Sequence, residues 1–128
     1  MKLLIDTHTF LWAVGDVSRL SRTSLDLVRD GNNQVLVSTA SLWEIAIKVS
    51  QGKLKLGGEF ETFIPLQFSL NRFETLAANL SHYALVARLP LHHRDPFDRL
   101  IIAQAMAEGV PVVSTDDKFD AYGVTRLW

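Results

Sequence analysis

The chain has 128 residues, of which 48% are hydrophobic and 21% charged, a balance that suits a single globular domain over residues 1–128. Its formal net charge of −1 excludes a protein that binds nucleic acid through bulk positive charge. It has no cysteine, which excludes disulfides, thiolate catalysis and cysteine-bound zinc and fits a reducing cytoplasm. Asp6 and His8 interrupt the apolar N-terminus, and no apolar run approaches the roughly 20 residues of a membrane span. We therefore expect a cytoplasmic protein without a signal peptide or membrane segment.

Short apolar runs alternate with segments of helical periodicity along the chain. In chain order, the expected elements are strand Lys2–Ile5, helix Ser18–Arg29, strand Gln34–Val37, helix Leu42–Val49, helix Phe60–Leu66, strand Phe68–Leu70, helix Thr75–Arg88, helix Pro96–Glu108, strand Val110–Val113 and strand Val124–Leu127. Short apolar strands between helices imply a parallel sheet that is covered on both faces. The predicted fold class is therefore α/β, a three-layer α/β/α sandwich with a central parallel sheet.

Four carboxylates stand at the ends of these expected elements. Asp6 follows the first strand, Asp116 follows the strand that ends near Val113, and Glu44 and Asp98 lie near the starts of helices. In a parallel α/β fold all of these positions share one rim, where ligands gather. Taken singly, each acid also has a structural explanation, as a turn residue, a helix cap or, for Glu44, a capping box with Ser41.

Together, the four acids favour a metal site. Carboxylates on one rim repel one another, and a hard divalent cation removes that cost because carboxylate oxygens are its preferred ligands. Oxygen ligands suit Mg²⁺ or Mn²⁺, whereas the lack of cysteine and of a spaced histidine pair argues against zinc. Such an ion lowers the pKa of a bound water and offsets charge on a phosphodiester. Metal-dependent phosphodiester hydrolysis is therefore the predicted chemistry.

The same segments resemble the PIN-domain ribonucleases, in particular the VapC-type toxins of type II toxin–antitoxin (VapBC) pairs. The similarity runs in order over nearly the whole chain. Its segments are Leu4–Trp12, Ser38–Ile45 with Gly52–Leu54, Leu89–Ala105, and Val113–Phe119 with Tyr122–Val124 and Trp128. The resemblance implies that the catalytic residues and metal ligands are Asp6, Glu44, Asp98 and Asp116.

Two of these assignments have a neighbouring competitor. Asp95 stands close to Asp98, and the family's spacing to Ala103 favours Asp98. Asp117 adjoins Asp116, and the spacing to the following aromatic residues favours Asp116. Ser114 stands where the family usually has threonine, and its hydroxyl could hold a water or a ligand.

Other residues near the acids have two interpretations each. Arg94 and Arg99 can grip a phosphate of the substrate or neutralise the acidic rim, and the sequence does not decide between these. Metal-activated water needs no histidine, so we assign no catalytic role to the histidines. Trp12, Trp43, Phe97 and Trp128 are more typical of core packing or a dimer contact than of base stacking. Lys48, Lys53 and Lys55 are expected on the solvated surface.

The resemblance implies an endoribonuclease toxin that cuts tRNA or rRNA with Mg²⁺ or Mn²⁺. It also implies a homodimer and a VapB-like antitoxin whose C-terminal segment covers the site. The alternative is a non-catalytic PIN-like module that binds RNA or a partner, and the complete acidic set argues against it. A barrel-type metal hydrolase would need histidine in place of Phe10, and an aspartyl phosphatase would need aspartate in place of His8.

Overall fold

A sheet of five parallel strands forms the centre of the computed structural model, which describes residues 1–128. The strands are β1 (Lys2–Ile5), β2 (Gln34–Ser38), β3 (Phe73–Leu76), β4 (Val112–Val113) and β5 (Arg126–Leu127), in the spatial order β3-β2-β1-β4-β5. Ile5 is in register with Val37 on one side and Val113 on the other. The carboxyl ends of β1, β2 and β4 therefore lie at one edge of the sheet.

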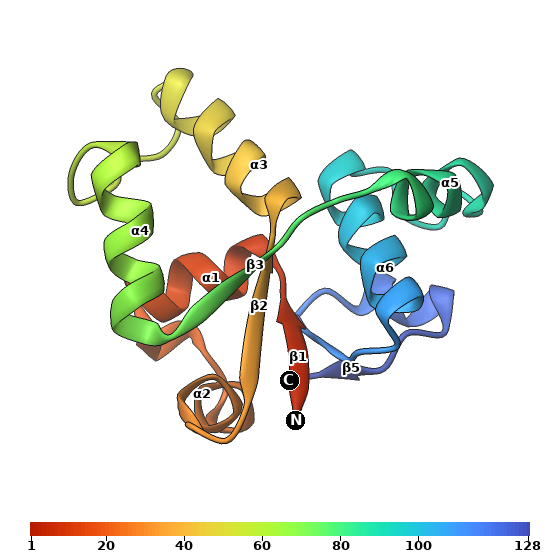
Figure 1. Ribbon diagram of the computed structural model, residues 1–128, viewed down its shortest axis with the longest axis horizontal. Helices are drawn as coiled ribbons and strands as arrows, with labels where there is room; N and C mark the ends of the chain where they lie inside the picture. Colours follow the sequence, from red (N-terminus) through yellow and green to blue (C-terminus); the bar gives the residue numbers. More distant parts are fainter.

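Helices cover both faces of this sheet, which gives the predicted α/β/α sandwich. They are α1 (Thr7–Val14), α2 (Arg22–Arg29), α3 (Thr39–Ser50), α4 (Phe60–Asn71), α5 (Leu80–Arg88) and α6 (Pro96–Glu108), with 3₁₀ turns η1 (Val17–Arg19) and η2 (Asp117–Tyr122). Figure 1 shows α1, α2 and α4 on one side and α5 and α6 on the other, while α3 starts at the end of β2. No helix combines the length and apolarity that crossing a bilayer requires.

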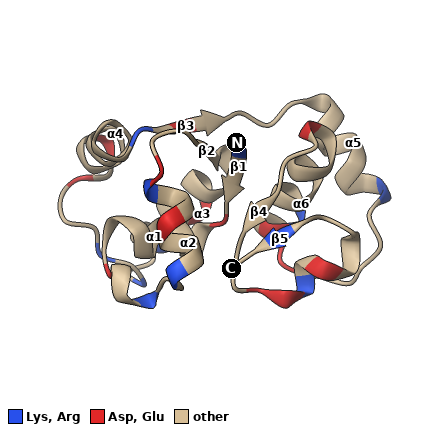
Figure 2. Ribbon diagram, turned by 90° about the horizontal axis from the view of Figure 1, so that it is seen from below, with Lys and Arg blue, Asp and Glu red and all other residues tan.

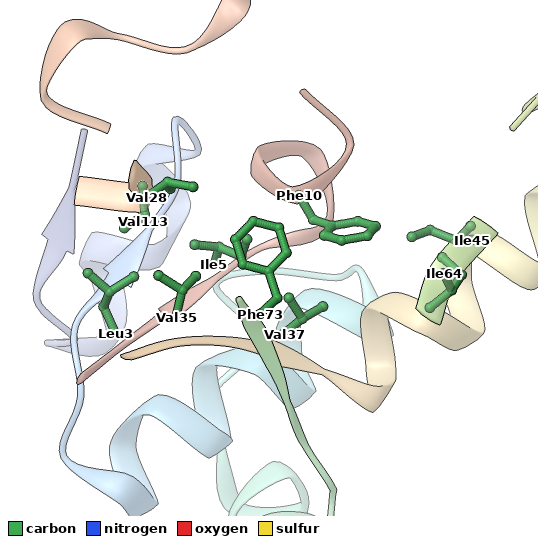
Figure 3. Close-up of a cluster of buried hydrophobic side chains, with 10 residues drawn as sticks. All are labelled: Leu3, Ile5, Phe10, Val28, Val35, Val37, Ile45, Ile64, Phe73 and Val113. Atoms are coloured by element: carbon green, nitrogen blue, oxygen red, sulfur yellow. The ribbon is translucent and has the colours of Figure 1, made fainter. Parts of the chain in front are cut away.

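Alternating strand residues feed two separate hydrophobic cores. Leu3 and Ile5 of β1 face one layer of helices, whereas Leu4 faces the other. The first core, drawn in Figure 3, contains Leu3, Ile5, Phe10, Val28, Val35, Val37, Ile45, Ile64, Phe73 and Val113. The second contains Leu4, Leu36, Ala40, Ile101, Ile102, Ala105, Val110, Val112 and Phe119. The sheet is therefore buried on both faces, as parallel sheets usually are.

The middle of the chain differs from the expectation. The predicted strand Phe68–Leu70 is wrong, because these residues continue α4 past Pro65, which lies inside the helix. The edge strand β3 follows instead, where a helix was expected from Thr75. Tertiary packing explains the difference: the Phe68 ring lies 5.7 Å from that of Phe10 and 6.2 Å from that of Phe73. The second half of α4 is thus held on the core by contacts that local sequence does not reveal.

The start of the chain contains a helix that the sequence did not predict. α1 follows β1 directly, and the Asp6 carboxylate caps it by accepting the N–H of Thr9. Threonines in the first turn have low helix propensity, which hides this helix from pattern reading. The helix expected from Ser18 begins at Arg22, because Ser21 forms its N-cap.

The first core should be sensitive to truncation of one of its two phenylalanines. Phe10 is fully buried, so Phe10→Ala should lower the free energy of unfolding by about 3–5 kcal/mol. Urea denaturation followed by circular dichroism measures this change. Tyr83→Ala is the control, because it removes a half-exposed ring from α5 and should cost far less. Equal losses in the two variants would contradict the assigned core.

Candidate active site

Asp6 and Ser114 tie the ends of two neighbouring strands together. Asp6 follows β1 and is 3% exposed. Its Oδ1 accepts the N–H of Thr9 at 2.9 Å, and its Oδ2 accepts the hydroxyl of Ser114 at 2.6 Å. The Ser114 hydroxyl in turn accepts the N–H of Asp116 at 3.0 Å. Ser114 thus orients Asp6 and the backbone of Asp116 at the carboxyl edge of the sheet.

Glu44 reaches this edge from the second turn of α3. The N-cap of α3 is Ser38, whose hydroxyl accepts the N–H of Ala40 at 2.9 Å. Ser41 therefore lies inside the helix, and the alternative explanation of Glu44 as part of a capping box with Ser41 is wrong. The Glu44 side chain is buried and pairs with Lys48 at 3.1 Å, so Lys48 belongs to the site rather than to the solvated surface as expected.

Asp95 and Asp98 have different roles at the start of α6. Asp95 is the N-cap, and its Oδ1 accepts the N–H groups of Phe97 and Asp98 at 2.8 and 3.0 Å. Asp98 does not cap the helix. Its Oδ2 lies 3.1 Å from His93 Nε2 instead, so its carboxylate faces the interior of the site.

The structure also separates Asp116 from Asp117. Asp116 Oδ2 lies 2.8 Å from the same His93 Nε2, whereas Asp117 is exposed. Potential ligand atoms of His93, Asp98 and Asp116 all fall within 4.8 Å of one another. The sequence left open the choice between Asp95 and Asp98 and between Asp116 and Asp117. In the structure, Asp98 and Asp116 are the two that come together.

His93 is the residue that sequence reasoning missed. It is 6% exposed and stands between two of the acids, although we expected no histidine to take part. Its neighbour His92 is exposed and packs against Tyr122. Nothing in the local sequence distinguishes the two, because the choice depends on how the loop before α6 folds onto η2.

Negative charge dominates the electrostatics around Asp98. The pKa of Asp98 is raised from 3.8 to about 8, first by burial and then by the charges of Asp95, Asp6, Glu44 and Asp116. All the charged groups that raise it are carboxylates, which places the four predicted ligands in one electrostatic cluster. A set of carboxylate oxygens fits a hard divalent cation such as Mg²⁺ or Mn²⁺, which would supply the missing positive charge.

The two arginines beside the acids differ in how they are engaged. Arg99 donates to the carbonyl oxygens of Val86, Leu89, Pro90 and His93 and to the Tyr122 hydroxyl, at 2.9–3.4 Å. These bonds give Arg99 a structural role at the end of α5, so we no longer expect it to grip phosphate. Arg94 is exposed and makes no ion pair, so it stays a candidate for substrate contact.

The aromatic residues near the site are also of two kinds. Trp43 is 65% exposed and packs edge-on against Phe97, with ring centres 5.6 Å apart. Core packing is therefore wrong for Trp43, and a dimer contact stays a prediction. Trp12 and Trp128 are partly buried and pack against each other at 5.9 Å.

The fold and this acidic edge define a class of protein. The sequence model of the PIN domain matches residues 3–124. The chain therefore belongs to the PIN domain family. A sequence comparison with curated proteins finds no significant match.

Solved structures with the same fold include proteins from several bacteria. VapBC2 from Rickettsia felis, solved with a promoter DNA fragment, contains a chain with a TM-score of 0.75 and 19% identity, covering 99% of this chain and 98% of its own. FitAcB from Neisseria gonorrhoeae contains a chain with a TM-score of 0.68 and 18% identity, and the match covers 98% of this chain and 96% of that chain. VapBC-5 from Mycobacterium tuberculosis contains a chain with a TM-score of 0.58 and 22% identity, and the match covers 94% of this chain and 89% of that chain. At these identities the likeness shows a shared fold.

The raised pKa of Asp98 has a measurable effect on the metal-free protein. The folded protein keeps a proton on Asp98 up to about pH 8, whereas the unfolded chain releases it near the usual pKa of 3.8. Between these values the folded state binds more protons than the unfolded chain, so the free energy of unfolding falls as the pH rises. Asp98→Asn removes this loss.

Thermal unfolding in EDTA from pH 4 to pH 8 tests this effect. The Asp98→Asn variant should match the wild type near pH 4 and become progressively more stable than it toward pH 8. A difference that does not grow with pH would contradict the electrostatic account of the cluster.

Proposed function

We propose that this protein is an endoribonuclease whose Asp6, Glu44, Asp98 and Asp116 hold Mg²⁺ or Mn²⁺. The observation that carries the proposal is that four carboxylates from separate segments gather at one edge of the sheet. Only one of them, Glu44, pairs with a lysine or arginine side chain. Such an arrangement costs stability in the absence of metal, as the raised pKa of Asp98 indicates.

A bound divalent ion would activate a water molecule and offset the charge that develops on the phosphodiester. The chain's own residues prepare the site. Thr9 and Ser114 orient Asp6 through hydrogen bonds, and Asp95 fixes the start of α6 so that Asp98 faces inward. Arg94, which is exposed and directly precedes Asp95, is the candidate for contact with a phosphate oxygen of the substrate. RNA as substrate, and tRNA or rRNA in particular, follows from the resemblance to VapC-type toxins.

We extend the proposal to the cellular role. The similar structures carry the names VapBC and FitAB, and the VapBC-5 structure is described as a member of a family of toxin–antitoxin systems. Together with the sequence resemblance, this supports a toxin that acts in the cytoplasm, forms a homodimer and is inhibited by a VapB-like antitoxin. A non-catalytic binding module is the alternative, and no observation favours it.

Removing a ligand should abolish catalysis without unfolding the protein. Asp6→Asn and Asp98→Asn should each reduce Mn²⁺-dependent RNA cleavage more than about 100-fold, because direct ligands matter more than the outer-shell partners whose loss costs 10–100-fold. The assay is incubation with total RNA in Mn²⁺ or EDTA, followed by mapping of the cut ends. Asp26→Asn, at an exposed ion pair on α2, is the matched control and should cleave normally.

Retention of full cleavage by both ligand variants, with circular dichroism showing a native fold, would end the assignment of the site. Absence of any Mn²⁺-dependent cleavage by the wild type on total RNA would favour the binding module.

The toxin role has a separate test in cells. Induced expression of the chain alone should arrest bacterial growth, and co-expression of a small protein encoded beside it should restore growth. Asp98→Asn should be harmless when expressed to the same level. Harmless wild-type expression would contradict the toxin role and leave the nuclease assignment standing.

A further inference from the structure

We infer that His93 is a positioning residue of the metal site, whose Nε2–H donates to Asp116 and keeps that carboxylate beside Asp98. The inference rests on the proposed function, because it concerns the same site. Its starting point is a single ring nitrogen that lies 2.8 Å from Asp116 Oδ2 and 3.1 Å from Asp98 Oδ2.

The other ring nitrogen decides which atom carries the proton. His93 Nδ1 lies 3.2 Å from the backbone nitrogen of Asp95 and accepts its N–H. An acceptor cannot itself carry a hydrogen toward that donor, so in the neutral ring the proton is on Nε2. Nε2 therefore donates to Asp116 Oδ2, with Asp98 Oδ2 beside it at 3.1 Å. A nitrogen that carries a proton has no free lone pair for a metal ion, so in this geometry His93 is a donor to the ligands rather than a ligand.

The ring is fixed on several sides. The backbone N–H of His93 donates to the Tyr122 hydroxyl at 2.8 Å, and its carbonyl accepts from Arg99. The ring packs edge-on against Phe119 of η2, with centres 5.9 Å apart. This support explains why Arg99 and Tyr122 are turned toward the loop: they hold the segment that carries His93.

The position matters because Asp98 and Asp116 come from different elements. Asp98 lies in α6 and Asp116 precedes η2, and the His93 ring stands between them, hydrogen-bonded to Asp116 and 3.1 Å from Asp98 Oδ2. Both close approaches are to Oδ2, and Oδ1 of Asp98 faces no protein donor. Outer-shell donors of this kind typically change metal affinity 10–100-fold when they are removed.

Calorimetric titration of the metal-free protein with Mn²⁺ tests the inference without using activity. His93→Ala should bind Mn²⁺ about 10–100-fold more weakly than the wild type. His93→Gln should recover most of the affinity, because its amide N–H can reach the same carboxylates. RNA cleavage by His93→Ala should shift to higher Mn²⁺ concentrations and recover at saturation.

His82 offers a matched control. It is also buried, and its Nδ1 also accepts a backbone N–H, from Asn79, but it lies on α5 away from the acids. His82→Ala should lower thermal stability and leave Mn²⁺ affinity unchanged. A loss of affinity in His82→Ala equal to that in His93→Ala would mean that general destabilisation explains both, and would overturn the inference.

The remaining outcomes separate the inference from the proposed function. If the wild type binds no Mn²⁺, the metal site fails and the inference fails with it. If the wild type binds and His93→Ala binds equally well, only the inference fails. Electron spin-echo spectroscopy of the Mn²⁺-loaded wild type gives an independent test, because strong ¹⁴N coupling from a coordinated imidazole would show that His93 is a direct ligand. That result would also overturn the inference, whether or not the variants fold.

Discussion

Repulsion among the carboxylates at the carboxyl edge of the sheet is the constraint on which the rest of the site depends. Most of the donors that meet these carboxylates are not Lys or Arg side chains: a backbone N–H and a hydroxyl donate to Asp6, and the His93 ring donates to Asp116. Lys48, beside Glu44, is the one cationic side chain paired with these four acids. Asp120, outside the cluster, shows the contrast, because hydrogen bonds from Arg126 lower its pKa. Asp120 is thus paired with an arginine, whereas three of the four acids at the edge have no Lys or Arg partner.

A network of buried hydrogen bonds joins the elements directly behind this edge. The Ser38 hydroxyl, at the end of β2, donates to the amide oxygen of Gln104 on α6, and the amide nitrogen of Gln104 donates to the carbonyl of Leu76 on β3. The Thr9 hydroxyl donates to the carbonyl of Val113 on β4. These bonds join α1, α6 and three strands just behind the acids. A site that must hold several like charges needs such a frame, because loose side chains would turn away from one another into water.

The sequence predicted the layers of the fold and the residues of the acidic edge better than it predicted individual elements. β1 and α6 were predicted with their correct bounds, because an apolar run ending at Asp6 and a helix between Pro96 and Gly109 are strong local signals. The boundary between α4 and β3 was wrong, because packing of Phe68 decides it. The position of His93 between two acids could not be predicted either, because it depends on contacts of the loop before α6 with Asp116, 23 residues further along the chain, and with Phe119 of η2. Ligand roles for the four acids stay predictions that the geometry supports.

The distribution of basic residues has a consequence for how an RNA would be recognised. Figure 2 shows Lys and Arg spread over both layers of helices rather than gathered on one face. For the proposed ribonuclease, few phosphates could then be neutralised by the protein, so binding would release few counterions and depend only weakly on monovalent salt. Selection of the target would rest instead on the shape of a folded RNA that fits the edge, with its scissile bond brought to the acids.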